Sequence, residues 1–471
     1  MSPQRQNFSD QPITREELVD GFVRAQRPDQ STHLIGTELE KLGVVIPTDG
    51  SPIRPVDYEH HVLPTLRGLH RQFGWEAGAD RGTSGEIVEL TRNGASITLE
   101  PGGQLELSGA PMTNVHETCA EFSEHYEELH AVSQSLSLAW MAAGHHPWAT
   151  REQINWMPKG RYAVMGSYLP TRGTRALDMM LRTCTVQANF DYASEAQCGQ
   201  RFALANAFAP VLTAIFANSP YLEGRSTGLA SIRSQVWLDV DPDRCGVPKL
   251  AFEPFTYERY VDWAIDVPMF FVKRDGVYHP HHVPFRKFLQ EGFVDAKGNR
   301  HEATHRDWFL HLSTVFPEVR LKPHIELRSA DAVGSRHVCA LPALGKGLLY
   351  DDDAAGQAWE LLANFSYEER MGLWQDAITH GLRSPQLQTL ARRLVDLARV
   401  ALDRMDIRDD KGRTEARFLD RLEPLLDQGI SPAHETLAQV GESPGTGASG
   451  RAALVRAYHF AGVDAPDPTD S

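Results

Sequence analysis

The chain has 471 residues, of which 41% are hydrophobic and 23% are charged, a balance typical of globular proteins long enough to bury a large core. Its net charge of -15 argues against broad nucleic-acid binding, because phosphate contacts need clustered lysines and arginines. The polar N-terminus lacks the apolar segment of a signal peptide, and no apolar run approaches the roughly 20 residues needed to cross a bilayer.

The cysteines give a further indication of the cellular compartment. Five of them are scattered along the chain without a CxxC pair: Cys119, Cys184, Cys198, Cys245 and Cys339. This pattern is typical of a reduced cytosolic protein rather than of a disulfide scaffold or a zinc ribbon. We therefore predict a cytoplasmic monomer or homodimer with reduced, structural thiols and with neither membrane nor nucleic-acid partners.

The first third of the chain is predicted to be rich in β-structure. A polar lead-in over 1–30, with a short helix near its end, precedes a β-like stretch over 33–45. A second β-rich stretch covers 85–107, where Pro101-Gly102-Gly103 predicts a tight turn between two strands. Apolar residues at helical spacing then predict a helix over 114–143.

The rest of the chain becomes progressively helical. A helix is predicted near 195–218 and a strand over 319–328, and Ser384-Pro385 and Ser431-Pro432 each read as an N-cap followed by proline. Since β-structure comes first and helices follow, the chain is predicted to be α+β rather than alternating βαβ. We predict a catalytic core over 31–353 and a helical region over 354–471 that packs on it.

Acidic pairs in the predicted strands are the first candidates for chemistry. Glu38 and Glu40 lie two apart in GTELE, so a strand would present both carboxylates on one face, where a divalent cation could compensate their repulsion. An exposed strand face with solvated acids is the alternative. The turn at Pro101-Gly102-Gly103 likewise allows Glu100 and Glu106 to approach one another, although a simple decorated hairpin explains the pattern too.

A third acid, Glu326, shares a predicted strand face with Arg328, and an ion pair would explain this arrangement as well. Acids on several strands together with strand-borne arginines suit metal-assisted phosphoryl transfer, in which basic side chains stabilise the transferring group. The basic candidates are Lys159, Arg161, Arg233, Arg320, Lys322 and Arg328. The sequence contains no GxxxxGK[ST] loop, GxGxxG fingerprint or GxSxG elbow.

Longer segments of the chain resemble the plant-type glutamate–cysteine ligases. The resemblance is carried by GTELEKLGV (36–44), ITLEPGGQLELSGAP (97–111), MPKGRYAVMGSYLP (157–170), LDMMLRTCTVQANFDYASE (177–195), FANSPYLEGRSTGLASIRSQVWLDVDPDRCG (216–246), FPEVRLKPHIELRSAD (316–331) and CALPALGKGLLYDDD (339–353). These segments occur in consistent order and cover most of residues 30–360, which makes the resemblance far more specific than any single short motif.

This resemblance implies a fold and a reaction. The fold is a glutamine-synthetase-like antiparallel sheet, curled into a funnel and backed by helices. In the reaction, ATP phosphorylates the γ-carboxyl of glutamate with the help of Mg²⁺, and the amine of cysteine attacks the acyl phosphate. Acyl phosphates hydrolyse, so the site should exclude water.

The resemblance also implies roles for individual residues. The metal-binding set is Glu38, Glu40, Glu100, Glu106 and Glu326, with Gln187 at the position of a histidine in more distant ligases. Arg233 matches the arginine that binds the glutamate substrate, as a planar fork suits a carboxylate, and Trp237 and Arg161 join it in the substrate pocket. Lys159, Lys322 and Arg328 are expected to contact the nucleotide, and Arg328 and Arg233 to act in catalysis.

The chain departs from the plant pattern at Leu39 and Gln235, which replace histidines, and at Leu42, which replaces a phenylalanine. Neither histidine replacement removes a proposed metal ligand. Three alternatives to the expected activity are a γ-glutamyl ligase with a different amine acceptor, a silent nucleotide- or amino-acid-binding protein on the same fold, and a metal-dependent hydrolase.

Overall fold

One large antiparallel sheet organises the protein. The computed structural model describes residues 10–460, so residues 1–9 of the predicted lead-in lie outside the described part. Within that part the sheet has ten strands in the order β17-β18-β8-β1-β6-β5-β4-β3, and β2 and β7 also pair with β1. The strands are β1 (Ile35–Val45), β2 (Arg54–Pro55), β3 (Glu76–Ala77), β4 (Glu89–Arg92), β5 (Ala95–Leu99), β6 (Leu105–Ser108), β7 (Leu138–Met141), β8 (Thr185–Phe190), β17 (Val319–Leu321) and β18 (Ile325–Asp331).

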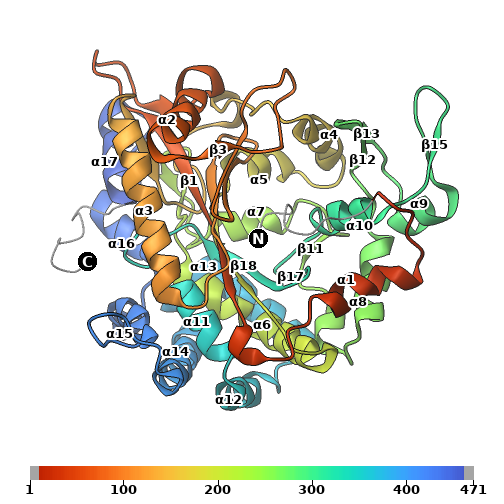
Figure 1. Ribbon diagram of the computed structural model, residues 1–471. Helices are drawn as coiled ribbons and strands as arrows, with labels where there is room; N and C mark the ends of the chain where they lie inside the picture. Colours follow the sequence, from red (N-terminus) through yellow and green to blue (C-terminus); the bar gives the residue numbers. More distant parts are fainter. Residues whose placement is uncertain (1–9, 461–471) are drawn as a thin grey trace.

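Shorter strand pairs lie outside this sheet. They are the antiparallel pairs β9 (Tyr221–Leu222) with β10 (Arg225–Ser226), β12 (Phe271–Arg274) with β13 (Val277–Pro280) and β14 (Phe293–Val294) with β15 (Arg300–His301), and the parallel pair β11 (Cys245–Gly246) with β16 (Phe316–Pro317). The β14–β15 hairpin projects from the body of the molecule (Figure 1).

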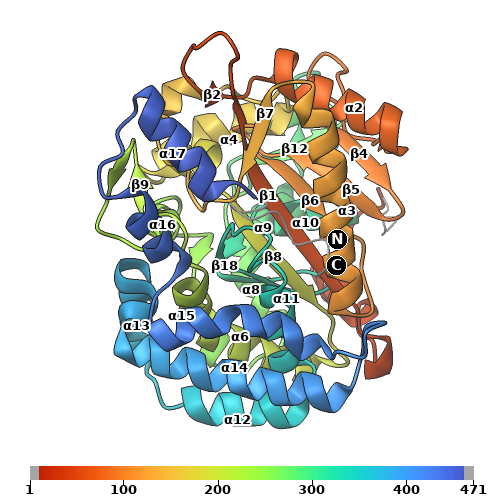
Figure 2. The ribbon, with the colours of Figure 1, turned by 90° about the vertical axis from the view of Figure 1, so that its left-hand side faces the viewer.

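Helices surround the sheet (Figures 1 and 2). Those before residue 351 are α1 (Asp20–Arg24), α2 (Leu63–Phe73), α3 (Val115–Gln134), α4 (Gly160–Tyr168), α5 (Ala176–Arg182), α6 (Glu195–Phe216), α7 (Ile232–Trp237), α8 (Tyr257–Asp266), α9 (Phe285–Glu291), α10 (His305–Leu312) and α11 (Ala340–Leu349). Those after it are α12 (Asp352–Leu362), α13 (Tyr367–His380), α14 (Pro385–Met405), α15 (Glu423–Gln428), α16 (Pro432–Val440) and α17 (Ala448–Tyr458). Among the described residues, no helix is long and apolar enough to span a bilayer.

The central strands give the sheet two different faces. Leu39 of β1 and its cross-strand partner Leu107 of β6 are fully buried on the apolar face. On the same face α11 approaches β8 so closely that a Cβ on Gly345 would lie 2.4 Å from the Phe190 ring. Side chains alternate along a strand, so Glu38 and Glu40 emerge on the opposite face. Leu39, where plant members have a histidine, is therefore a core residue.

The C-terminal region is helical, as predicted. The Ser384 side chain caps α14 by accepting a hydrogen bond from the Leu387 backbone N–H, and proline occupies the first turn. Helices α12 and α14 lie below the sheet in both views (Figures 1 and 2). One hydrophobic core joins residues from Ile13 to Phe460, and it crosses the predicted domain boundary at residue 353. That boundary stays a prediction.

Two secondary-structure predictions are wrong. The helix predicted over 114–143 ends at Gln134, and Leu138–Met141 instead forms β7, which pairs with β1. A four-residue apolar run fits either period, so only the available partner strand decides its structure. The single strand predicted over 319–328 is a hairpin, because a turn, in which the Lys322 backbone N–H donates to the His324 carbonyl, reverses the chain between β17 and β18.

The prediction of reduced cysteines is also wrong. Cys119 on α3 and Cys339 at the start of α11 form a disulfide, with Cα atoms 6.0 Å apart, a spacing normal for such a bond. The two cysteines are 220 residues apart in sequence, and only the packing of α3 beside α11 brings them together. Cys184, Cys198 and Cys245 are free thiols.

Candidate active site

The polar face of the central sheet brings together acids from three strands. Glu38 lies opposite Gln187 of β8, and Glu40 lies opposite Glu106 of β6. Directly paired residues in an antiparallel sheet share a face. Glu38 and Glu106 are 8% and 9% exposed, so the alternative of a solvated strand face does not hold for β1.

Glu100 joins this acidic group from the turn after β5. The Gly103 backbone N–H donates to the Glu100 carbonyl, and Gly103 has a φ of 84°, a left-handed conformation that glycine adopts without strain. The predicted turn at Pro101-Gly102-Gly103 is thus confirmed. It places Glu100 close enough to Glu40 and Glu106 to perturb their titration.

Burial and nearby carboxylates raise the pKa values of Glu38, Glu40 and Glu106. The pKa of Glu40 is raised well above its ordinary value, first by burial and then by the charges of Glu100 and Glu106. The pKa of Glu106 is also raised, by burial and by Glu100, although the Ser108 hydroxyl donates to it over 2.6 Å. Burial and the nearby Glu326 raise the pKa of Glu38 as well. This part of the face therefore favours a cation.

Glu326 has the opposite surroundings. It is fully buried, and three cations contact it: Arg320 from the paired strand at 2.6 Å, Lys322 at 2.9 Å and Arg328 at 3.1 Å. Burial alone would raise its pKa, but these cations hold the pKa well below its usual range. The ion-pair interpretation of Glu326 and Arg328 is thus correct for this structure, and Arg320 belongs to the same cluster.

Gln187 and Asn189 of β8 lie between the acidic group and the cationic cluster around Glu326. The Arg328 guanidinium donates to the Gln187 side-chain oxygen over 2.6 Å, so that amide oxygen already has a partner. The Asn189 side-chain NH₂ group lies 3.4 Å from Glu38, whereas its buried oxygen has no hydrogen-bond partner within residues 10–460. Asn189 was not singled out from the sequence, although its position two residues after Gln187 puts both amides on one face.

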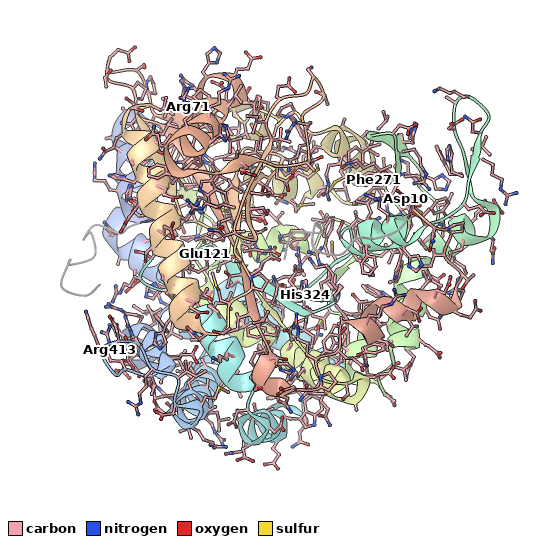
Figure 3. The ribbon with its side chains drawn as sticks, in the orientation of Figure 1. Asp10, Arg71, Glu121, Phe271, His324 and Arg413 are labelled. Atoms are coloured by element: carbon pink, nitrogen blue, oxygen red, sulfur yellow. A yellow bond between two sulfur atoms is a disulfide. The ribbon has the colours of Figure 1, made fainter. Side chains whose placement is uncertain are left out.

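Lys159 and Arg161 approach the acidic group from the start of α4. Lys159 is 9% exposed, and burial lowers its pKa, partly offset by the charge of Glu100. The Arg161 guanidinium lies 6.0 Å from the ring centre of Phe271, which Figure 3 labels on β12. Its buried Nε has no partner in the part of the chain that the structure describes. Both side chains thus come from the N-terminal end of α4, Lys159 as its N-cap residue and Arg161 from its first turn.

Arg233 and Trp237 lie on α7, beside the end of β18. The Arg233 side chain is 5% exposed, and its Nη2 donates to the Arg328 carbonyl over 2.9 Å. Its Nε and the Trp237 indole N–H are buried without a hydrogen-bond partner among the described residues. Two unpaired donors on one short helix suit an anionic or polar ligand.

The donor chemistry of the acidic group fits Mg²⁺, which prefers carboxylate oxygens and retains bound water. The described residues do not include three or more His, Cys, Asp or Glu side chains already arranged around a metal position. The face therefore assembles the right oxygens without a closed protein cage, as expected where substrate phosphates supply part of the coordination. The individual metal and substrate roles stay predictions.

His324 is a further residue that the sequence did not single out. It lies in the turn between β17 and β18, two residues before Glu326, is 4% exposed and has no partner for either ring nitrogen in the described chain. Burial and the charge of Lys322 hold its pKa well below the usual value. Figure 3 labels it near the centre of the molecule.

Comparison with known proteins places this site in a family. The profile of glutamate-cysteine ligase family 2 matches residues 34–454. A glutamate–cysteine ligase from Arabidopsis thaliana is 39% identical over 430 residues, which cover 91% of this chain and 80% of the relative. One from Oryza sativa subsp. indica is 38% identical over 433 residues, covering 91% of this chain and 85% of the relative.

A solved structure agrees in fold. The glutamate–cysteine ligase of Francisella tularensis, in complex with AMP, superposes with a TM-score of 0.53 at 13% identity, covering 90% of this chain and 86% of the other. The sheet, with its helical backing, is thus that of a glutamine-synthetase-like ligase, and the expected fold class is confirmed. Within that class, the chain belongs to glutamate-cysteine ligase family 2, in agreement with the resemblance to the plant-type enzymes.

The same relatives contradict the predicted cytoplasmic location. The names of the Arabidopsis, Brassica juncea and rice proteins all place them in the chloroplast. The prediction rested on the polar N-terminus and the unpaired cysteines, and the disulfide removes the second of these grounds as well.

Proposed function

We propose that this chain is an ATP-dependent glutamate–cysteine ligase that joins the γ-carboxyl of glutamate to the amine of cysteine through a γ-glutamyl phosphate. Two observations carry the proposal: the family match extends over residues 34–454, and Glu38, Glu40, Glu106 and Glu326 lie on a single face of the sheet. The product would be the first intermediate of glutathione or a related thiol.

The acidic group would hold Mg²⁺ through Glu38, Glu40, Glu100 and Glu106. Glu326 would join this set once its basic partners bind the phosphates of the nucleotide instead of its carboxylate. When bound, Mg²⁺ would neutralise the triphosphate and the charge that develops during phosphoryl transfer. Lys322 and Arg328 already lie at 2.9 and 3.1 Å from Glu326, so they would meet the nucleotide's phosphates beside the metal. Lys159 would stabilise the same charge from α4.

The glutamate substrate would bind beside α7, against the side chain of Arg233. The unpaired Nε of Arg233 gives that guanidinium an available edge for a carboxylate, whose two oxygens match its planar fork. Trp237 would shape the pocket, and Arg161 would contribute a second cation to hold the substrate. Because these groups are buried, they would also keep water from the acyl phosphate.

The test is ADP release from the purified protein with ATP, Mg²⁺, glutamate and a panel of amines. We expect release that depends on both glutamate and cysteine, with γ-glutamylcysteine as the product by mass spectrometry. Release that needs another amine would assign a different acceptor. Nucleotide binding without turnover would make the chain a silent binder, and ADP release independent of any amine would indicate a hydrolase.

A further inference from the structure

An irregularity in β18 turns Asp331 toward the polar face of the sheet, the face that carries Glu38 and Glu326. Strict strand alternation would place Asp331 on the apolar face. Glu326 pairs with Asn189 and Asp331 pairs with Thr185, but the register shifts between Leu327 and Ala330. Asp331 follows Glu326 by five positions while their partners are only four positions apart, so β18 contains a one-residue bulge. A bulge inverts the alternation beyond it. Asp331 therefore shares the face of Glu326.

Asp331 is buried, with 1% of its surface exposed, and it accepts hydrogen bonds from the residues around the start of α7, the helix that carries Arg233. Its Oδ2 accepts from the Asn218 backbone N–H over 2.8 Å and from the Ser219 hydroxyl over 2.6 Å. Its Oδ1 accepts from the Ser231 hydroxyl over 2.9 Å and lies 3.9 Å from Nη1 of Arg233.

Each of the two serines in turn fixes α7. The Ser219 hydroxyl oxygen accepts from the Arg233 backbone N–H over 3.2 Å. Ser231 is the N-cap of α7, where its hydroxyl oxygen accepts from the Ser234 backbone N–H over 3.1 Å. Asp331 thus controls the start of the helix, the backbone of Arg233 and one side of its guanidinium. With Nη2 bound to the Arg328 carbonyl, the Nε side is the one left toward a ligand.

We infer that Asp331 is the positioning residue that orients Arg233 toward the carboxylate of the glutamate substrate, an inference that rests on the proposed function. A neighbouring glycine supports it, because a Cβ on Gly144 would lie 2.3 Å from the Asp331 carboxyl carbon. A side chain at position 144 would therefore displace this carboxylate. A purely structural acid would hold the fold without affecting one substrate selectively.

The experiment is a double-mutant cycle on the full-length protein. Asp331→Asn should raise the KM for glutamate about tenfold or more, because a small misplacement of a binding group has effects of this size, while the KM for ATP changes less than about twofold. In an Arg233→Ala background, the same change should raise the glutamate KM less than about twofold further. Gly144→Ala, which displaces the carboxylate but keeps its charge, should reproduce the selective effect.

Glu318→Gln is the matched control. Glu318 is a buried carboxylate whose charge also acts on Arg233, but none of the hydrogen bonds that fix α7 reaches it. We expect an unchanged glutamate KM. An equal rise in this variant, or a full further rise from Asp331→Asn in the Arg233→Ala background, would overturn the positioning role. An unchanged glutamate KM in Arg233→Ala alone would remove Arg233 from substrate binding and would overturn the positioning role too. The absence of glutamate-dependent turnover in the unmodified protein would instead overturn the proposed function.

Discussion

Glu40 and Glu326 lie on the same sheet face in opposite electrostatic surroundings, and this contrast predicts opposite effects on stability. Glu40 shares a buried region with Glu100 and Glu106, which raise its pKa. Replacing it by glutamine removes a repelling charge and keeps an acceptor for the Thr185 N–H. We expect Glu40→Gln to raise the unfolding free energy of the metal-free protein by about 1 kcal/mol at neutral pH, measured by urea denaturation, and to abolish turnover.

The raised pKa of Glu40 also determines how the stability of the protein depends on pH. A carboxyl whose pKa is raised in the folded state binds more protons folded than unfolded, so its contribution to stability is greatest when it is protonated. The metal-free protein should therefore lose stability from Glu40 as the pH rises above the ordinary value of 4.5. Urea titrations at several pH values should show a shallower decline in Glu40→Gln. An identical slope would place Glu40 outside the repelling group.

Glu326→Gln should have the reverse effect. The change leaves Arg320, Lys322 and Arg328 beside a neutral amide in a buried region, and removing one partner of a buried ion pair costs about 3–5 kcal/mol. The depressed pKa of Glu326 means that its contribution exists above its unfolded pKa and disappears in acid. Urea denaturation at neutral pH checks the loss. A Glu326→Gln protein as stable as the unmodified one would show that the ion pairs of Glu326 make no net contribution to stability.

At the scale of elements, the disulfide gives a test of how α3 is held against α11. Cross-linking residues 220 apart restricts the unfolded chain by up to about 5 kcal/mol in the loop-entropy model. Cys119→Ser, Cys339→Ser and the double variant should all lose the same free energy of unfolding, since each removes the same bond. Cys245→Ser, at a free thiol, is the control. A double variant that loses twice as much as either single one would contradict the bond.

The elements also show how far the sequence could predict this structure. Glu38 and Glu40, the glycine turn beside Glu100 and the serine caps follow from local rules, and all were predictable. β7 was not, because its apolar residues fit helix and strand alike until a partner strand is known. The role of Asp331 was hidden for a related reason: the bulge that turns it toward the site depends on pairing with β8, and strict alternation assigns it to the other face.

At the scale of the whole molecule, the site combines two halves of opposite sign that no single segment supplies. β1, β6 and the turn after β5 supply the acids, of which Glu40 and Glu106 have raised pKa values, whereas β17 and β18 supply the cations around Glu326. A bare triphosphate would meet the cations and be repelled by the acids. Its complex with Mg²⁺ would suit both halves.

This division predicts that the nucleotide stabilises the protein much more with Mg²⁺ than without it. Mg²⁺ with a non-hydrolysable ATP analogue at about 100 times its Kd should raise the unfolding free energy by about 2.7 kcal/mol, seen as a higher Tm by differential scanning calorimetry. The analogue with EDTA should give a much smaller shift, because the acids then oppose its charge. Glu40→Gln should reduce the difference between the two conditions. Equal shifts with and without Mg²⁺ would mean that the acids do not bind the metal and that the cations alone hold the nucleotide.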